Sequence, residues 1–258
     1  MKTVVLVKQV PDTYGIRALL PDGRVDRSGA DSVTDEINER ALEFALQLRE
    51  THGGDVTVLT MGPESAAKSL RRLLASGADR AIHILDPGLV GADIVQTAQV
   101  LASALEKTPF DLIVTGNEST DGRSGAVPWM VAELLRVAQA TFIRSATIEG
   151  DKVRGERVTP EGYQEVEAAL PALISVTEQI AEPRFPSLKG VLAAKKKPLE
   201  TVNADDLGLD RALIGGASSR SAVLGVAARP ARSAGTIISD DGSAVTQLIE
   251  FLSARKLT

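Results

Sequence analysis

Residues 55–85, which read DVTVLTMGPESAAKSLRRLLASGADRAIHIL, decide the fold class. Val56–Thr60 is a short run of β-branched and aliphatic residues, which is typical of a buried strand. Met61–Ser65 is a turn, and the helical spacing of the apolar residues after it continues until Gly77. Ala81–Leu85 then predicts another buried strand. Two strands joined by a helix indicate a parallel pair with a right-handed crossover.

The same alternation of strand and helix continues on both sides of this unit. Further strands are predicted at Val4–Val7 and Leu112–Thr115, and further helices at Asp35–His52, Ile94–Leu105 and Ser124–Leu135. Asp35 is a good N-cap for the first of these helices, and Asn38 adds polar support to its start. Residues 11–34 are rich in turn signals and predict a long excursion with a small extended segment near Arg24–Asp26. The whole pattern predicts an α/β fold, doubly wound around a mostly parallel sheet.

The pattern changes after Arg136. Four strands are predicted one after another, at Phe142–Ile148, Lys152–Arg157, Gln164–Ala169 and Ala172–Val176. Because a tight Glu-Gly-Asp turn joins the first two, we expect antiparallel strands to extend the parallel core. Residues 183–235 contain several Pro and Gly and little periodicity, which indicates an extended arm, and an amphipathic terminal helix follows. The predicted division is an α/β domain at 1–182 and a loop-and-arm region at 183–258.

Composition excludes several classes of protein. The chain has 258 residues and a net charge of −5, whereas a general nucleic-acid binder usually carries a basic excess. It contains no cysteine, so disulfides, a thiolate nucleophile and a Cys-based metal site are excluded, and we expect a reducing, cytoplasmic location. The apolar run at residues 4–7 is too short for a signal-peptide core. No apolar stretch approaches the roughly 18–20 residues that span a bilayer, so we expect no membrane insertion.

Residues 115–128, which read TGNESTDGRSGAVP, form the most informative loop. The loop joins a predicted strand to a predicted helix, and open parallel sheets bind ligands at the carboxyl ends of their strands. Its glycines let a ligand approach the backbone, and a helix start with Ser124 nearby suits a phosphate. Asp121 can accept hydrogen bonds from the backbone or from ribose hydroxyls. A plain strand-to-helix loop has a similar composition, so both interpretations stay open on this evidence.

Motifs for catalysis and for metals are absent from the sequence. No Gly-Lys-Ser/Thr follows the loop, and Lys8–Pro11, after the first strand, contains no Gly-x-Gly. His52 and His83 each lack a second His, a Cys or a carboxylate at metal spacing, so structural or surface roles are expected. We therefore predict a binding protein with no catalytic residue and no metal site.

Residues 182–197, which read EPRFPSLKGVLAAKKK, form the second notable segment. A loop flanked by prolines presents Phe185 and Leu188, and a short helix ends at Lys195, Lys196 and Lys197. The plain interpretation is a solvated helix end, because lysines at a helix C-terminus are favoured by the helix dipole. The alternative is a docking site, in which an apolar anchor is ringed by charge.

Together these segments resemble the β subunits of electron-transferring flavoproteins, from the first strand to about residue 210. The resemblance is carried by Val7–Asp12, Asp35–Glu39, Met61–Pro63, Ser76–Ala81, Gly116–Pro128 and Glu182–Lys197, the last being the most specific. It implies a heterodimer in which the α subunit holds most of the FAD, while the β subunit forms a wall near the flavin and buries a structural AMP. The implied AMP contacts are Leu6, Asp35, Asn38, Met61, Gly116, Glu118, Ser119, Thr120, Asp121, Gly122, Ser124, Gly125, Ala126 and Val127.

The resemblance also implies partners. Leu188, aided by Phe185 and the three lysines, would dock flavin dehydrogenases such as the acyl-CoA dehydrogenases of fatty acid oxidation. The FAD would carry electrons one at a time to a downstream quinone oxidoreductase. The arm after about residue 197 would wrap the α subunit.

The sequence departs from the family at two positions. Val158 stands where relatives often have an acidic residue that helps to hold the flavin domain, and Ile37 stands where some have an aromatic near the flavin. Alternative interpretations remain. They are an electron-splitting relative with a second FAD in place of AMP, a free-standing nucleotide-binding module of the universal-stress type, and an enzyme that uses ATP. The stress-type module does not account for residues 182–197 and the arm, and the enzyme would need a catalytic Lys, His or metal-ligand pair that the sequence does not show.

Overall fold

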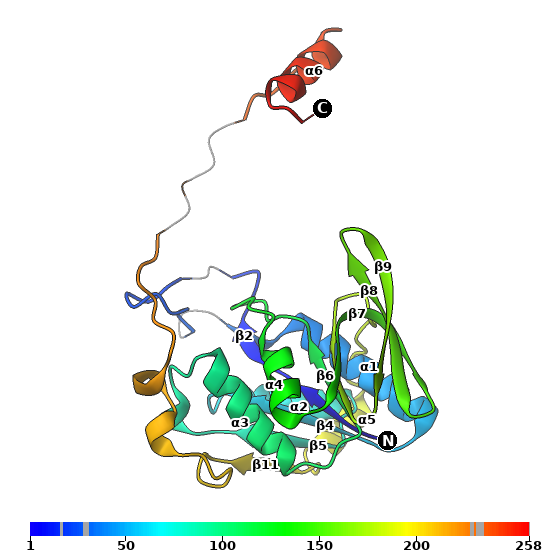
Figure 1. Cartoon of the computed structure of the whole chain (residues 1–258), viewed down its shortest axis with the longest axis vertical. Helices are drawn as coiled ribbons and strands as arrows, with labels where there is room; N and C mark the ends of the chain where they lie inside the picture. Colours follow the sequence, from blue (N-terminus) through cyan, green and yellow to red (C-terminus); the bar gives the residue numbers. More distant parts are fainter. Residues whose placement is uncertain (16–17, 28–30, 228–229, 231–234, 258) are drawn as a thin grey trace. The chain divides into compact units, whose positions relative to one another are not determined.

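The chain is described by a computed structural model that covers residues 1–15, 18–27, 31–227, 230 and 235–257 (Figure 1). Its contacts divide it into two units, Met1–Val223 and Leu224–Thr258. The first unit contains the sheet and the helices that cover it, and the second contains helix α6 (Ala244–Ala254).

Within the described residues, the main sheet has nine strands. Their order is β11, β5, β4, β1, β6, β10, β7, β8 and β9. In that order their bounds are Leu199–Val202, Arg80–Ile84, Asp55–Met61, Lys2–Leu6, Leu112–Gly116, Ala172–Val176, Ala138–Glu149, Lys152–Thr159 and Gly162–Ala169. Neighbours from β11 to β7 are parallel, whereas β8 and β9 are added antiparallel. The predicted α/β fold, mostly parallel with an antiparallel extension, is confirmed.

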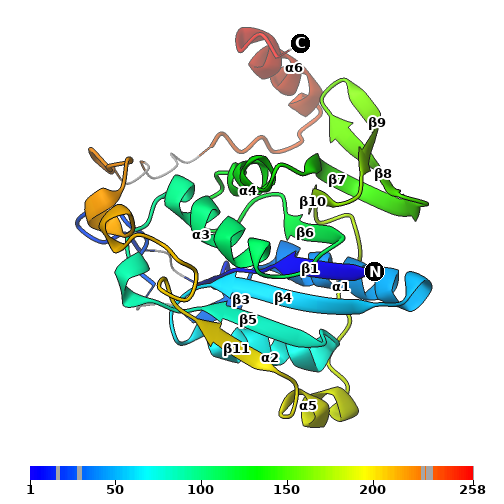
Figure 2. The same cartoon turned by 60° about the horizontal axis from the view of Figure 1, so that its bottom comes forward.

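Helices cover both faces of the sheet (Figure 2). One face carries α1 (Glu36–His52) and α2 (Ala66–Ser76), and the other carries α3 (Ile94–Glu106) and α4 (Val127–Leu135). Side chains alternate along β1, so Val5 joins the apolar core of α1 and α2 while Val4 and Leu6 join the core of α3 and α4. The central strands of the sheet are thus buried on both sides, as a doubly wound fold requires.

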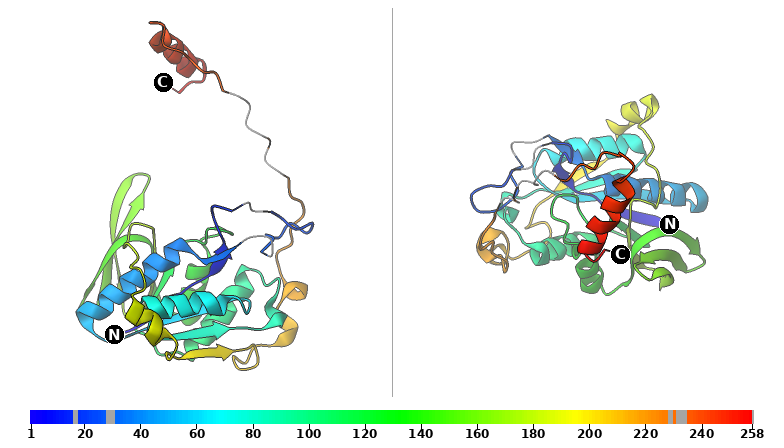
Figure 3. Two further views of the ribbon diagram at one scale, coloured as in Figure 1. Left: turned by 180° about the vertical axis from the view of Figure 1, so that it is seen from behind. Right: turned by 90° about the horizontal axis from the view of Figure 1, so that it is seen from above.

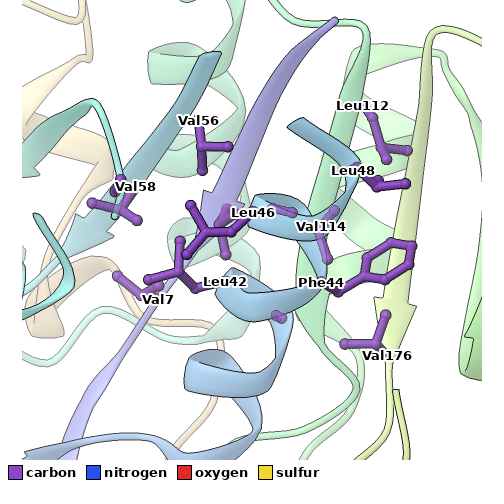
Figure 4. Close-up of a cluster of buried hydrophobic side chains, with 14 of the residues drawn as sticks. Val7, Leu42, Phe44, Leu46, Leu48, Val56, Val58, Leu112, Val114 and Val176 are labelled. Atoms are coloured by element: carbon purple, nitrogen blue, oxygen red, sulfur yellow. The ribbon is translucent and has the colours of Figure 1, made fainter. Parts of the chain in front are cut away.

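Helix α1 fills much of the core on its face (Figure 4). Asp35 caps its start, as predicted, by accepting a hydrogen bond from the Ile37 N–H at 3.1 Å. The helix ends at His52, and Gly53, its C-cap, has a φ of 70°. Between these ends, the fully buried Leu42 and Leu46 pack against the valines of β1, β4 and β6.

Strand β10 differs from its predicted place. It follows the antiparallel strands in sequence, yet it lies between β6 and β7 and is parallel to both. All five of its residues are buried. An uninterrupted buried apolar run is typical of the middle of a parallel sheet, whereas the largely exposed β8 and β9 suit an outer ribbon. The expectation that Ala172–Val176 belongs to the antiparallel extension was therefore wrong.

Helix α4 begins later than predicted, at Val127 and not at Ser124. Arg123 and Gly125 have φ values of 51° and 62°, which are left-handed. A right-handed helix needs φ near −60°, so it cannot start before these residues. The residues before Val127 remain a loop.

Part of the predicted arm packs on the first unit. Helix α5 (Leu188–Ala194) lies against α2, and β11 pairs in parallel with β5 at the sheet edge. Neither β11 nor the small ribbon of β2 (Gln9–Pro11) and β3 (Ser32–Thr34) was predicted from the sequence. By their contacts, residues 183–223 belong to the first unit. The predicted division after residue 182 separates the segments that would bind partners from the nucleotide-binding domain, and it stays a prediction.

The second unit contains the predicted terminal helix, α6. Its apolar residues Val245, Leu248 and Ile249 are exposed within the described chain. Three such residues at helical spacing form one apolar side of the helix.

Candidate functional site

The loop at residues 115–128 lies at the carboxyl ends of β1 and β6, which are neighbouring parallel strands. The start of α1 reaches the same edge, because the backbone N–H of Lys8 donates to Asn38 Oδ1 at 2.8 Å. Gly116 lies so close to α1 that a Cβ there would be 2.7 Å from Asn38 Nδ2. The structure therefore brings the predicted Asn38 and Gly116 together, and the Asn38 amide holds the chain after β1.

Asp35 ties the loop to α1. This residue is fully buried, and one carboxylate oxygen caps the helix while the other accepts from Thr120. Asp35 Oδ2 lies 2.7 Å from the Thr120 N and 2.9 Å from the Thr120 hydroxyl oxygen. Asp35 is thus both a helix cap and the anchor of a loop 85 residues away. The cap was visible in the sequence, but the loop anchor was not.

Asp121 is a second carboxylate with a buried side chain. Its Oδ1 accepts from Lys8 Nζ at 2.8 Å, and its Oδ2 is paired with Arg27. Burial acts to raise the pKa of Asp121, but the Lys8 charge and the hydrogen bonds from Lys8 and Arg27 outweigh it and hold that pKa well below its usual range. Neither Lys8 nor Arg27 was predicted from the sequence to belong to the site. A conspicuous lysine after the first strand was the available signal.

The remaining predicted loop residues lie around these two carboxylates. Glu118 pairs with Arg123 at 2.7 Å across the loop, and Ser119 Oγ lies 3.3 Å from Lys8 Nζ. Gly122 and Ser124 are exposed at the loop surface. Gly125, Ala126 and Val127 are partly buried and lead into α4.

Asn117 offers an unused hydrogen-bond acceptor. The residue is 9% exposed, and its Oδ1 has no hydrogen-bond partner among the residues that the structure describes. A buried polar atom without a partner costs about 1–3 kcal/mol, so a donor on a ligand would complement it. Close by in sequence, α4 begins after Ala126 without a side-chain cap. Pro128 has no N–H, so the N–H groups of Val127 and Trp129 are those that the first turn offers to an anion. Asn117 was not among the individual contacts predicted from the sequence.

Leu6 and Met61 end the neighbouring strands β1 and β4. Both join the apolar core beneath α3 and α4, Leu6 buried and Met61 partly so. The predicted contacts from three strands and two helix starts thus meet at one edge of the sheet. They combine apolar side chains, buried carboxylates and loop backbone at that edge.

The predicted docking residues divide into two groups. Phe185 is 90% exposed and Leu188 is 79% exposed, so both apolar side chains stand out from the first unit. Lys195 and Lys196 are exposed as well. Lys197 instead turns inward, where its Nζ donates to the backbone carbonyls of three residues at the end of α2, namely Leu74, Gly77 and Ala78.

Across the described ranges of the chain, no group of three His, Cys, Asp or Glu residues could hold a metal ion. His83 is buried with Nε2 3.1 Å from the Gly62 carbonyl, and His52 ends α1. In the same described part of the chain, no helix is both long enough and apolar enough to cross a membrane.

Comparisons with known proteins place these features in context. A family model for the electron transfer flavoprotein domain matches residues 22–207. The chain is 48% identical to the electron transfer flavoprotein subunit beta of Mycobacterium tuberculosis over 98% of both chains. It is 37% identical to the protein of that name from Thermoanaerobacterium thermosaccharolyticum over 99% of both chains. For the Megasphaera elsdenii protein the identity is 35% over the full length of both.

Proposed function

The chain belongs to the electron transfer flavoprotein family as a β subunit, and we propose that it is the nucleotide-binding, partner-docking half of a heterodimer. In this proposal the α subunit holds most of the FAD and this chain buries an AMP. The relatives are named as subunits of an electron carrier, and we assign no catalytic residue to this chain. Its proposed role is to bind the nucleotide and to dock and orient redox partners.

The loop between β6 and α4 is the observation that carries the proposal. Asp35 anchors this loop from one side, and Lys8 anchors it through Asp121 from the other. Asn117 Oδ1, which has no partner within the described part of the chain, and the uncapped start of α4 point to a ligand that has both hydrogen-bond donors and an anionic group. A nucleoside monophosphate has both.

The residues present suit the parts of an AMP. The start of α4, with Gly125 and Ala126 before it, would receive the phosphate on backbone N–H groups. Asn117 Oδ1 would accept from the base or the ribose. Met61 is partly buried and supplies apolar surface at the end of β4, while Leu6, at the end of β1, is buried in the apolar core that Met61 packs against. Because Asp121 is engaged by Lys8 and Arg27, we assign it to holding the loop and those two cations in place.

Docking is assigned to the segment around α5. Phe185 and Leu188 form the exposed apolar anchor, and Lys195 and Lys196 add positive charge beside it. Flavin dehydrogenases of the acyl-CoA dehydrogenase type are the proposed electron donors, and a quinone oxidoreductase is the proposed acceptor. When bound by the heterodimer, FAD supplies the one-electron chemistry that joins the two, as in fatty acid oxidation. A cytoplasmic setting, without nucleic acid or membrane insertion, completes the proposal.

The test is mass spectrometry of the small molecules released when the purified heterodimer is denatured. We expect AMP and FAD in a ratio of one to one. Two FAD and no AMP would instead identify an electron-splitting relative with FAD at the loop. ATP, or no nucleotide, would contradict the proposal and favour a stress-type module or an ATP-using enzyme.

A further inference from the structure

The docking segment 184–197 is fixed at its beginning by α1. Arg184 Nε and Nη2 donate to the two carboxylate oxygens of Glu43 at 2.6 and 2.9 Å, a two-point contact. Arg184 Nη1 also reaches Glu50 at 2.5 Å. One turn earlier on α1, Arg40 Nη1 donates to the Ala181 carbonyl at 2.8 Å. These contacts hold the chain on α1 just before the exposed Phe185.

The two carboxylates that bind Arg184 are in different surroundings. The Glu43 side chain is 6% exposed, whereas that of Glu50 is 51% exposed. A two-point pair with a buried carboxylate is held in one geometry, while a pair with an exposed carboxylate is screened by water and contributes little. Glu43 is therefore the residue that orients Arg184, and Glu50 is its natural control.

The end of the docking segment is fixed by α2. Lys197 Nζ lies 3.0 Å from the Leu74 carbonyl oxygen and 2.6 Å from that of Ala78, at the C-terminal end of α2. Burial lowers the pKa of this ammonium group. The positive charge complements the negative end of the helix dipole. In return, Arg71 of α2 donates to the carbonyls of Ala194 and Lys197, at 2.9 Å each.

Helix α5 itself touches α2 (Figure 3). A Cβ at Gly190 would be 2.3 Å from the Ala75 carbonyl oxygen, so the backbones are in direct contact. Ser187 caps α5 by accepting from the Gly190 N–H at 3.0 Å. Leu188 thus projects from a short helix that is bound on its other side.

We propose that Glu43 and Lys197 are positioning residues. They hold segment 184–197 in one arrangement, so that Phe185 and Leu188 are in their binding positions before a partner arrives. This inference rests on the proposed docking function of the segment. A short loop and a seven-residue helix would otherwise populate many arrangements, and only a fraction of them would bind. The apparent affinity falls in proportion to that fraction. Of the three lysines, only Lys195 and Lys196 then face the partner.

The test uses the holo heterodimer, with a purified acyl-CoA dehydrogenase and its acyl-CoA as the electron donor. Glu43→Gln and Lys197→Met should each raise the KM for the dehydrogenase roughly ten-fold if about a tenth of the molecules keep the bound arrangement. We expect kcat and AMP content to stay near wild type. Glu50→Gln, which removes only the exposed partner of Arg184, should leave the KM unchanged.

Two further measurements separate positioning from a simple loss of charge or of folding. Hydrogen exchange of the free heterodimer should show faster exchange at residues 187–194 in Glu43→Gln and Lys197→Met, and not in Glu50→Gln. Added salt should weaken docking less in Lys196→Met than in the wild type, whereas Lys197→Met should keep the wild-type salt dependence.

Leu188→Ala separates this inference from the docking function on which it rests. If Leu188→Ala raises the KM while Glu43→Gln and Lys197→Met change neither the KM nor the exchange, positioning is refuted and docking stands. If Leu188→Ala also leaves the KM unchanged, the docking function fails and the inference fails with it. A Lys197→Met variant that loses salt dependence as Lys196→Met does would likewise overturn the assignment of Lys197.

Discussion

Asp35 performs two tasks with one carboxylate. It caps α1 through the Ile37 N–H and holds the 115–128 loop through Thr120. A polar residue before a helix start predicts only the helix cap. The second depends on α1 and the loop meeting at the carboxyl edge of the sheet, because the two are far apart in the chain.

Asp35→Ala should therefore destabilise the protein and release the nucleotide. Loss of an N-cap costs about 1 kcal/mol, and loss of the Asp35 acceptor by the partly buried Thr120 N–H and hydroxyl adds about 1 kcal/mol more. Glu36→Ala is the matched control, since Glu36 is exposed in the same helical turn. Urea unfolding and the AMP content of each variant are the measurements. Equal effects of the two substitutions would contradict the assigned role of Asp35.

Asp121 should make stability depend on pH in the acid range. Its pKa is lowered in the folded protein, so the folded state binds its proton more weakly than the unfolded chain does. The resulting stability is fully present above the ordinary carboxyl pKa of about 3.9 and is lost as the pH falls from there through the folded-state value. Asp121→Asn should flatten this loss.

The measurement is the free energy of unfolding between about pH 3 and pH 7, the range that brackets the ordinary carboxyl pKa. Glu64→Gln, at an exposed position in the turn before α2, serves as the control. If Asp121→Asn loses stability on acidification as steeply as the wild type does, the loss of stability at low pH does not come from protonation of Asp121 and loss of its pairing with Lys8 and Arg27.

At the scale of elements, the backbone of the loop decides where α4 begins. Gly125 has a φ of 62°, and a Cβ there would meet nothing closer than 3.6 Å. The need for glycine is therefore conformational and not steric. Gly122 belongs to the same loop but has no left-handed φ, and a Cβ there would meet Ser119 Oγ only at 3.7 Å.

Gly125→Ala should cost about 1–2 kcal/mol, the penalty for a side chain in the left-handed region. It should also weaken AMP binding, because the loop must shift relative to the first N–H groups of α4. Gly122→Ala should be nearly neutral in both respects. Thermal unfolding and calorimetric titration of the nucleotide-free heterodimer with AMP compare the pair, and a larger effect at Gly122 would refute the argument.

The packing of elements also decides which charged side chains face solvent. Three consecutive lysines look alike in the sequence, yet Lys197 faces the end of α2 while Lys195 and Lys196 face solvent.

The positions of strands in the sheet are likewise not set by their order in the sequence. Ala172–Val176 and Gln164–Ala169 are near neighbours in sequence, but the first is an inner parallel strand and the second lies in the outer ribbon.

At the scale of the whole molecule, the chain divides after Val223, well beyond the docking segment. The first unit has a core on both faces of its sheet, and the second presents an apolar side of α6. An exposed apolar helix face usually marks a contact with another protein. We expect that contact to be with the α subunit.

Truncation after Val223 should leave the first unit folded and able to bind AMP, while association with the α subunit weakens. We expect the truncated chain to unfold cooperatively, as the full chain does. Its heterodimer with the α subunit should dissociate on dilution during gel filtration. Mixing with α subunit at rising concentration checks whether association is weakened or lost. A truncated chain that pairs as tightly as the full one would assign the contact to the first unit alone.

The sequence by itself determined the fold class, the family and most of the elements. Periodicity, caps and turns are local properties of the chain, and they located β1, β4, β5 and β6 and the helices that join them. The loop at 115–128 and the segment at 182–197 were visible for the same reason. Only the tertiary structure placed β10 between β6 and β7, added β11 at the edge, and brought Lys8 to Asp121 and Arg184 to Glu43. These contacts join residues far apart in sequence, and they depend on which buried surfaces and charges meet once the sheet has formed, which no local pattern records.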